Sequence, residues 1–206
     1  MGNEVKRFFL IFAMTAGLHA QDVDSRQVPP EVVASAVKAV ADLGREVVLG
    51  RYQVAIERMY PQWKERAAKR MGGMEKLEIQ LDGVAKQMLQ QGISITDFTP
   101  AGKPRAYGVF PGKTVEVIDG EEVEKPRYTK WLVLVPTVTK FRALLKGDPV
   151  AVNIESTGFQ VAICEKGKDD WTFIDGSGVT VNDLRSLFIT LPQDLELHPL
   201  EKRQIR

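Results

Sequence analysis

Two aspartates and a tyrosine are the side chains of this 206-residue chain that could do acid–base chemistry. Asp97 in ITDFTP and Asp175 in TFIDGSG each stand at the end of a segment typical of a β-strand, and Tyr60 stands where a helical segment is broken before a proline. A carboxylate in an apolar pocket can have its pKa raised towards neutrality and can then exchange protons with a substrate. The alternative is that both aspartates accept hydrogen bonds from turn amides, a common role of Asp at such places.

The sequence gives little support for catalysis by histidine or cysteine, or for a metal or nucleotide site. His19 lies near the N-terminus and His198 near the C-terminus, so the sequence predicts no histidine in the folded body and no histidine general base. Cys164 is the only cysteine and lies in an apolar run, which predicts a buried thiol. The pair Asp169–Asp170 lacks the alternate spacing of a calcium loop, and RMGGMEK lacks the spacing of a phosphate loop. We therefore expect no metal site and no cofactor.

Aromatic side chains could instead line a site for a flat or apolar ligand. Trp131 and Phe173 lie within regular strand patterns and are predicted to be core residues. Tyr60 and Trp63 flank the break in the helical segment, where they form either a corner of the scaffold or the rim of a pocket, and the sequence leaves both open. The candidate ligand-binding residues are Tyr52, Tyr60, Trp63, Phe98 and Trp171.

Residues 1–20 have the layout of a secretory signal peptide, because Lys6 and Arg7 precede a short apolar run. The run is too short to cross a bilayer core of about 30 Å. We expect cleavage after Ala20 and an exported protein, periplasmic or extracellular, without membrane insertion. An uncleaved anchor is the alternative, because Leu18 is a poor residue for a cleavage site.

The charge balance argues against polyanionic partners. The chain has 28 basic and 27 acidic side chains, and removal of the predicted signal peptide leaves equal numbers of the two. Nucleic-acid binding requires a surplus of Lys and Arg on one face, and a basic membrane-binding patch requires a similar cluster. We expect no nucleic-acid partner, and a small ligand or another protein instead.

The order of local patterns predicts one α+β domain over residues 30–192, with N-terminal helices packed against an antiparallel β-sheet. A flexible lead-in, 21–29, comes before it. Thr180 and Asp183 have the spacing of a helix capping box. Residues 193–206 are predicted to be a tail that crosses the surface and ends disordered. Helices are expected from Pro30 to Gly50 and then in RYQVAIERM, PQWKERAAKR and MEKLEIQLDGVAKQMLQQG; strands are expected in ISITDF, AYGVF, TVEVI, YTKWLVLVPTVTK, VAVNIES, FQVAICE and WTFID.

Three segments, GRYQVAIERMYPQW, MGGMEKLEIQLDGVAKQMLQQGI and GKDDWTFIDGSG, resemble small exported bacterial proteins of the nuclear transport factor 2-like (NTF2-like), cystatin-like superfamily. The resemblance covers residues 30–192. It implies helices cradled by a curved antiparallel sheet that forms a cone with an open mouth. In enzymatic members an Asp works inside the cone, often with a His or a Tyr, and this chain departs from that pattern in its histidines. Since members include isomerases, dehydratases and binding modules, the fold alone does not give the function.

Three functions remain open from the sequence. The first is an exported, non-catalytic binding module for a small ligand or a protein partner. The second is a lyase or isomerase that uses Asp97 or Asp175 with Tyr60 in the cone. The third is a scaffold that forms a homodimer by burying the sheet face of WLVLVPTVT.

Overall fold

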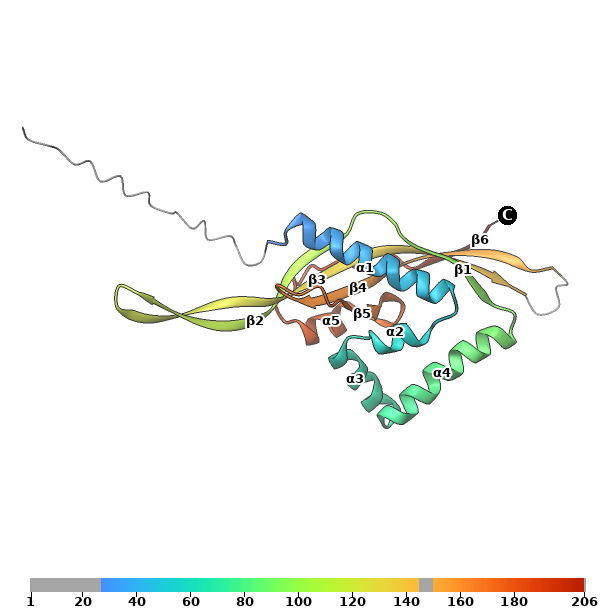
Figure 1. Ribbon diagram of the computed structural model, residues 1–206, viewed down its shortest axis with the longest axis horizontal. Coiled ribbons are helices and arrows are strands. Elements are labelled where there is room, and N and C mark those ends of the chain that lie inside the picture. The colour runs from blue at the N-terminus through green and yellow to red at the C-terminus, as the bar shows by residue number, and fades with distance from the viewer. Residues whose placement is uncertain (1–26, 145–149, 206) are drawn as a thin grey trace, which may run out of the picture.

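The computed structural model of the chain describes residues 27–144 and 150–205 (Figure 1). The predicted signal peptide and most of the predicted lead-in lie outside the described residues. The fold is α+β, as predicted, with helices first and a six-stranded, mostly antiparallel sheet after them. The helices are α1 (Pro30–Val48), α2 (Gln53–Glu57), α3 (Pro61–Met71), α4 (Met74–Gln90) and α5 (Val181–Leu187), with the 3-10 turn η1 (Gly176–Gly178); the strands are β1 (Ser94–Pro100), β2 (Arg105–Ile118), β3 (Glu121–Ala143), β4 (Val152–Glu165), β5 (Thr172–Asp175) and β6 (Glu201–Ile205).

Proline and glycine set the helix boundaries. Both α1 and α3 begin with proline in the first turn, where a missing amide donor costs nothing. Helix α3 ends at Gly72, whose φ of 83° is in the left-handed region that glycine adopts without strain. Thr180 and Asp183 form the capping box that the sequence predicts at the start of α5.

The sheet has long strands at its centre and shorter ones end to end at its edges. β3 pairs with β4 along most of its length, while β1 and β2 follow one another along the other edge of β3. In the same way β5 and β6 follow one another along the outer edge of β4. Beyond the body of the sheet, β2 and β3 continue as a two-stranded ribbon (Figure 1).

Two predicted turns do not form, because in each case the two strands predicted on either side are one continuous strand. β2 runs through Pro111 and Gly112, and β4 runs through Gly158. Proline is tolerated in β2 because this strand lies at an edge, where a missing amide breaks no ladder on the outer side. The hairpin at Asp119–Gly120 forms as predicted, and its φ angles of 54° and 86° match the two-residue turn that such a pair favours.

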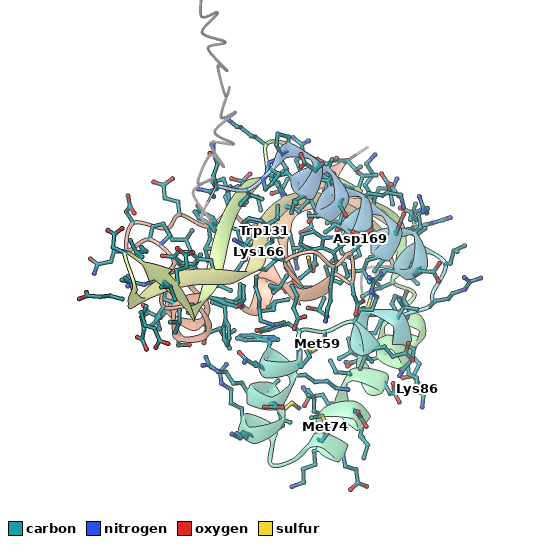
Figure 2. All side chains as sticks on the ribbon, turned by 60° about the vertical axis from the view of Figure 1, so that its left-hand side comes forward. Met59, Met74, Lys86, Trp131, Lys166 and Asp169 are labelled. Atoms are coloured by element: carbon teal, nitrogen blue, oxygen red, sulfur yellow. The ribbon has the colours of Figure 1, made fainter. Side chains whose placement is uncertain are left out.

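Both faces of the sheet are covered. On one face α1 packs over Trp131, Val133 and Val135 of β3, together with Trp171 and Phe173. Trp131 and Phe173 are core residues, as the sequence predicts, and the Lys166 ammonium lies 3.7 Å from the centroid of the Trp131 ring (Figure 2).

On the other face, Leu132 and Leu134 pack against α5 and the segment that follows it. Residues Trp131–Val135 are therefore buried on both faces within one chain, so the described structure gives this segment no exposed apolar face for a twin.

The prediction that the tail ends disordered is wrong for the described residues, which extend to 205. Leu195 is buried in the core on the α5 side, and Glu201–Ile205 form β6, which pairs with the first half of β4. The Arg203 guanidinium also pairs with Glu155 of β4 across the two strands.

Close packing of α1 on β1 generates a stability prediction. A Cβ added at Gly44 would lie 2.3 Å from Phe98 Cδ1 and 2.8 Å from the Phe98 carbonyl oxygen, so helix and strand must separate. We expect Gly44→Ala to lower the free energy of unfolding by about 1–3 kcal/mol in chemical denaturation.

Gly83→Ala is the matched control for this prediction. Gly83 lies inside α4, and its added Cβ would meet nothing within 4 Å. Alanine should therefore raise stability there by about 0.5–1 kcal/mol. Equal effects of the two substitutions would contradict the close contact between α1 and β1.

Candidate functional site

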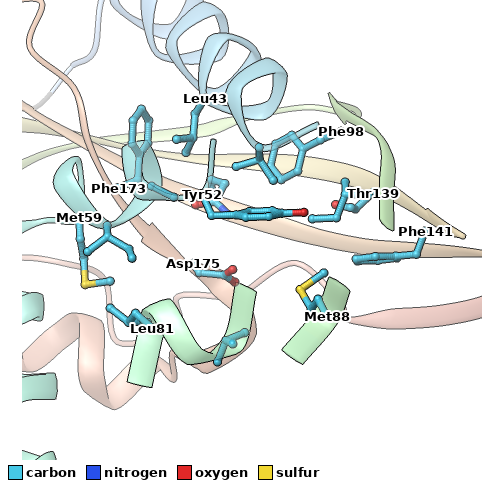
Figure 3. Close-up of a pocket in the computed structure, with 16 residues that line it drawn as sticks. Leu43, Tyr52, Met59, Leu81, Met88, Phe98, Thr139, Phe141, Phe173 and Asp175 are labelled. Atoms are coloured by element: carbon cyan, nitrogen blue, oxygen red, sulfur yellow. The ribbon is translucent and has the colours of Figure 1, made fainter. Parts of the chain in front are cut away.

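An apolar cavity of about 400 Å³ lies between the helices and the α1-covered face of the sheet (Figure 3). Its walls come from α1, α2 with the residues that flank it, α4, and strands β1, β3, β4 and β5. Most lining side chains are aliphatic or aromatic, and the polar ones are few. The lining residues are Leu43, Val47, Tyr52, Ala55, Ile56, Met59, Leu81, Val84, Met88, Ile95, Phe98, Thr139, Phe141, Gln160, Phe173 and Asp175.

Helix α4 forms one wall of this cavity. Leu81, Val84 and Met88 recur at spacings of three and four, so they lie on one side of the helix and line the cavity. Helix α4 packs mainly against α3 and α2 rather than against the sheet, and Met74 at its start lies at the far end of the α3–α4 pair (Figure 2). The apolar side of α4, which in a helix packed on a sheet would belong to the core, therefore forms a wall of the cavity.

The sheet side of the cavity is built around Phe98. Its ring is fixed from behind by the close approach of Gly44. Tyr52, at the N-terminal boundary of α2, lies across the cavity, and Phe141 follows from β3, where it is two residues along from Thr139, the partner of Phe98 (Figure 3). Of the aromatic residues proposed from sequence, Tyr52 and Phe98 are the two that meet here.

The two candidate aspartates are in different places. Asp175 lies at the end of β5 and lines the cavity, but its Oδ1 accepts a hydrogen bond of 2.7 Å from the Ser177 amide and so caps η1. Asp97 is at an irregularity inside β1, not at a strand end, and its carboxylate lies 3.5 Å from the Lys140 ammonium. Asp97 does not line the cavity, so the two carboxylates do not form one site.

Tyr60 belongs to the scaffold. Its side chain is only 4% exposed, its ring centroid lies 5.5 Å from that of Phe188, and burial raises the pKa of its hydroxyl. The hydroxyl donates to Gln62 Oε1 at 3.3 Å, and the backbone amide donates to the Phe173 carbonyl at 2.8 Å. Tyr60 therefore fixes the corner between α2 and α3, and it does not line the cavity that contains Asp175.

The two candidate tryptophans also lie outside the cavity. Trp63 packs partly against the α5-side core, with the Arg70 guanidinium 5.7 Å from its ring centroid. Trp171 is buried, and its indole Nε1 donates to Ser35 Oγ at 2.9 Å and to Asp169 Oδ1 at 3.0 Å. Trp171 thus fastens the β4–β5 connection to α1.

Other chemistry finds no support in the described residues. Burial raises the pKa of the Cys164 thiol to about 11, which keeps the thiol protonated and unreactive at neutral pH. Residues 27–144 and 150–205 contain no group of three or more His, Cys, Asp or Glu side chains that could hold a metal ion. No helix in this part of the chain is long and apolar enough to cross a membrane.

Comparison with known proteins adds no assignment. The chain matches no family model, and no curated protein or solved structure is significantly similar to it.

The prediction that no histidine lies in the folded body is wrong, because His198 packs into it. Its ring packs against Phe159, with centroids 6.0 Å apart, and its Nε2 atom is buried with no hydrogen-bond partner among the described residues. Burial, and then the charge of Arg105, lower the pKa of His198. Phe159 belongs to the α5-side core, so His198 lies across the sheet from the apolar cavity.

The lowered pKa of His198 predicts a loss of stability on acidification. The unfolded chain takes up a proton near the ordinary histidine pKa of about 6.5, while the folded chain resists protonation until a lower pH. The free energy of unfolding should therefore fall as the pH drops below about 6.5. Denaturation of the wild type and of His198→Phe at pH 7 and pH 5 tests this, because phenylalanine keeps a ring on Phe159 and cannot be protonated. Identical pH slopes for both proteins would refute the assignment.

Proposed function

We propose that the chain is an exported, non-catalytic binding module of the NTF2-like type that holds a small apolar ligand. The observation that carries this proposal is the apolar cavity of about 400 Å³ between α1, α2, α4 and the sheet. Ligand pockets commonly measure about 300–1,000 Å³ and combine an apolar lining with a few polar groups that orient the ligand.

The arrangement of elements supports the NTF2-like part of the proposal. Helices precede the antiparallel sheet, and the first of them lies over one sheet face. Met59, just after α2, makes a parallel bridge to Phe173 of β5, which ties the helical half to the sheet beside the cavity. Export rests on the sequence of residues 1–20.

A lyase or isomerase is the second candidate, and one observation favours it. Asp175 and Tyr52 line the same cavity, although the tyrosine proposed from sequence was Tyr60. Binding is preferred because Asp175 is exposed and already accepts the Ser177 amide. A general base would instead need a free carboxylate oriented towards a reacting proton.

Two substitutions on α4 test the cavity as the binding site. Val84 is 47% exposed and lines the cavity, whereas Ile79 is 64% exposed on the same helix and does not line it. We expect Val84→Glu to weaken binding of the uncharged apolar fluorophore N-phenyl-1-naphthylamine about tenfold or more, because a ligand would bury the new charge. Ile79→Glu should change it less than about twofold, since that side chain is solvated in both states.

Fluorescence titration of purified protein measures both affinities, with circular dichroism to show that each variant is folded. Equal loss of binding in the two variants would place the fluorophore on the general surface of α4. No binding to the wild type would count against the binding module itself.

A further inference from the structure

The apolar cavity continues into a second, more polar cleft of about 590 Å³ on the same side of the sheet. The two share five lining residues, Phe98, Thr139, Phe141, Gln160 and Asp175. A molecule bound in the apolar cavity can therefore extend past these shared residues into the cleft. The site has two ends of different chemistry.

Strand register explains which side chains face this cleft. Phe98 of β1 is opposite Thr139 of β3, Thr139 is opposite Ser156 of β4, and Ser156 is opposite Lys202 of β6. Directly opposite residues in antiparallel strands point to the same face, so these four form a row across the sheet. Phe98 stands at the apolar end of the row, and hydroxyls and an ammonium follow.

The next positions along the strands continue the polar surface. Thr137 and Gln160 are two of the few buried polar residues of the described chain, and both line the cleft. Gly158 lies between them in register with Thr137, and its missing side chain leaves room over the sheet. Hydroxyl and amide groups both donate and accept hydrogen bonds, so this surface suits a ligand group that does the same.

The charges around the cleft do not favour an ion. Asp175 and Lys202 line it together, with opposite signs. Glu201 also lines it, but Glu201 is next to Lys202 on β6 and its side chain points to the other face, so Asp175 is the acidic lining side chain that shares the face of Lys202. A carboxylate or phosphate near Lys202 would also meet the Asp175 carboxylate, whereas an uncharged hydroxyl group would not be repelled.

We propose that the ligand is a single-chain amphiphile whose alkyl or acyl chain occupies the apolar cavity beside α4 and whose uncharged, hydroxyl-bearing head lies in the cleft of Thr139, Ser156 and Gln160. This inference rests on the proposed function, since it requires the apolar cavity to bind a ligand. A cavity of about 400 Å³ is near the lower end of the size range for ligand pockets, which suits one chain rather than two.

The proposed chemistry of the head group can be tested with three ligands that have the same ten-carbon acyl chain. Each is used to displace N-phenyl-1-naphthylamine. The ligands are 1-monodecanoylglycerol, methyl decanoate and decanoate, each used below the concentration at which it forms micelles or separates from solution. Monodecanoylglycerol should bind about tenfold more tightly than methyl decanoate, because its glycerol hydroxyls can each form a hydrogen bond in the cleft. Decanoate should bind more weakly than monodecanoylglycerol.

Ser156→Ala locates the head, because Ser156 lines the polar cleft and not the apolar cavity. It should lower the affinity ratio of monodecanoylglycerol to methyl decanoate about three- to tenfold, the effect of losing one hydrogen bond. Thr99→Val is the matched control, because Thr99 is exposed, follows Phe98 in β1 and lies on the opposite face, so the ratio should not change.

The outcomes separate this inference from the function on which it rests. If the fluorophore binds but methyl decanoate displaces it as well as monodecanoylglycerol does, the assignment of the head is overturned and the apolar site stands. If decanoate binds more tightly than monodecanoylglycerol, the uncharged head is also overturned, in favour of an anionic head near Lys202. Failure of the fluorophore to bind overturns both proposals.

Discussion

The alternation of apolar side chains along β3 decides where the other elements must pack. Trp131, Val133 and Val135 point to one face and Leu132 and Leu134 to the other, and all are buried. Such a strand requires cover on both sides, because at about 25 cal/mol per Å² an exposed apolar face would cost several kcal/mol. Helix α1 covers one face, and α5 with the following segment covers the other. The cavity lies on the same face as α1, between α1, α2, α4 and the sheet.

The element order and the helix boundaries could be predicted from the sequence because they depend on local chemistry. Pro30 and Pro61 begin helices, Gly72 ends one, and the Asp119–Gly120 pair makes its hairpin. The predicted strand breaks at Pro111–Gly112 and Gly158 were wrong. Proline is accepted in β2 at the sheet edge, and Gly158 lies between the stretches of β4 that pair with β6 and with β5.

The site could be predicted only in part, because its residues meet through tertiary structure. Tyr52, Phe98 and Asp175 were candidates by type, yet nothing in their spacing shows that they share a cavity while Tyr60 and Trp171 are scaffold. Leu81, Val84 and Met88 have the spacing of a core face, and that pattern is the same for a helix packed on a sheet and for one that stands off it. His198 was missed because contact with Phe159 depends on the path of the chain after α5.

Strand β3 also passes through two environments that differ in how firmly the backbone is held. From Lys130 onward it is hydrogen-bonded to β4 on one side and to β2 or β1 on the other. Before Thr129, in the ribbon, β2 is the one strand among the described residues that pairs with it, and no further strand pairs with β2 there. Backbone amides in the ribbon can therefore exchange with solvent by local opening, while amides a few residues further along exchange only when the sheet opens. A single strand thus carries the chain from a segment accessible to proteases into the most protected part of the molecule.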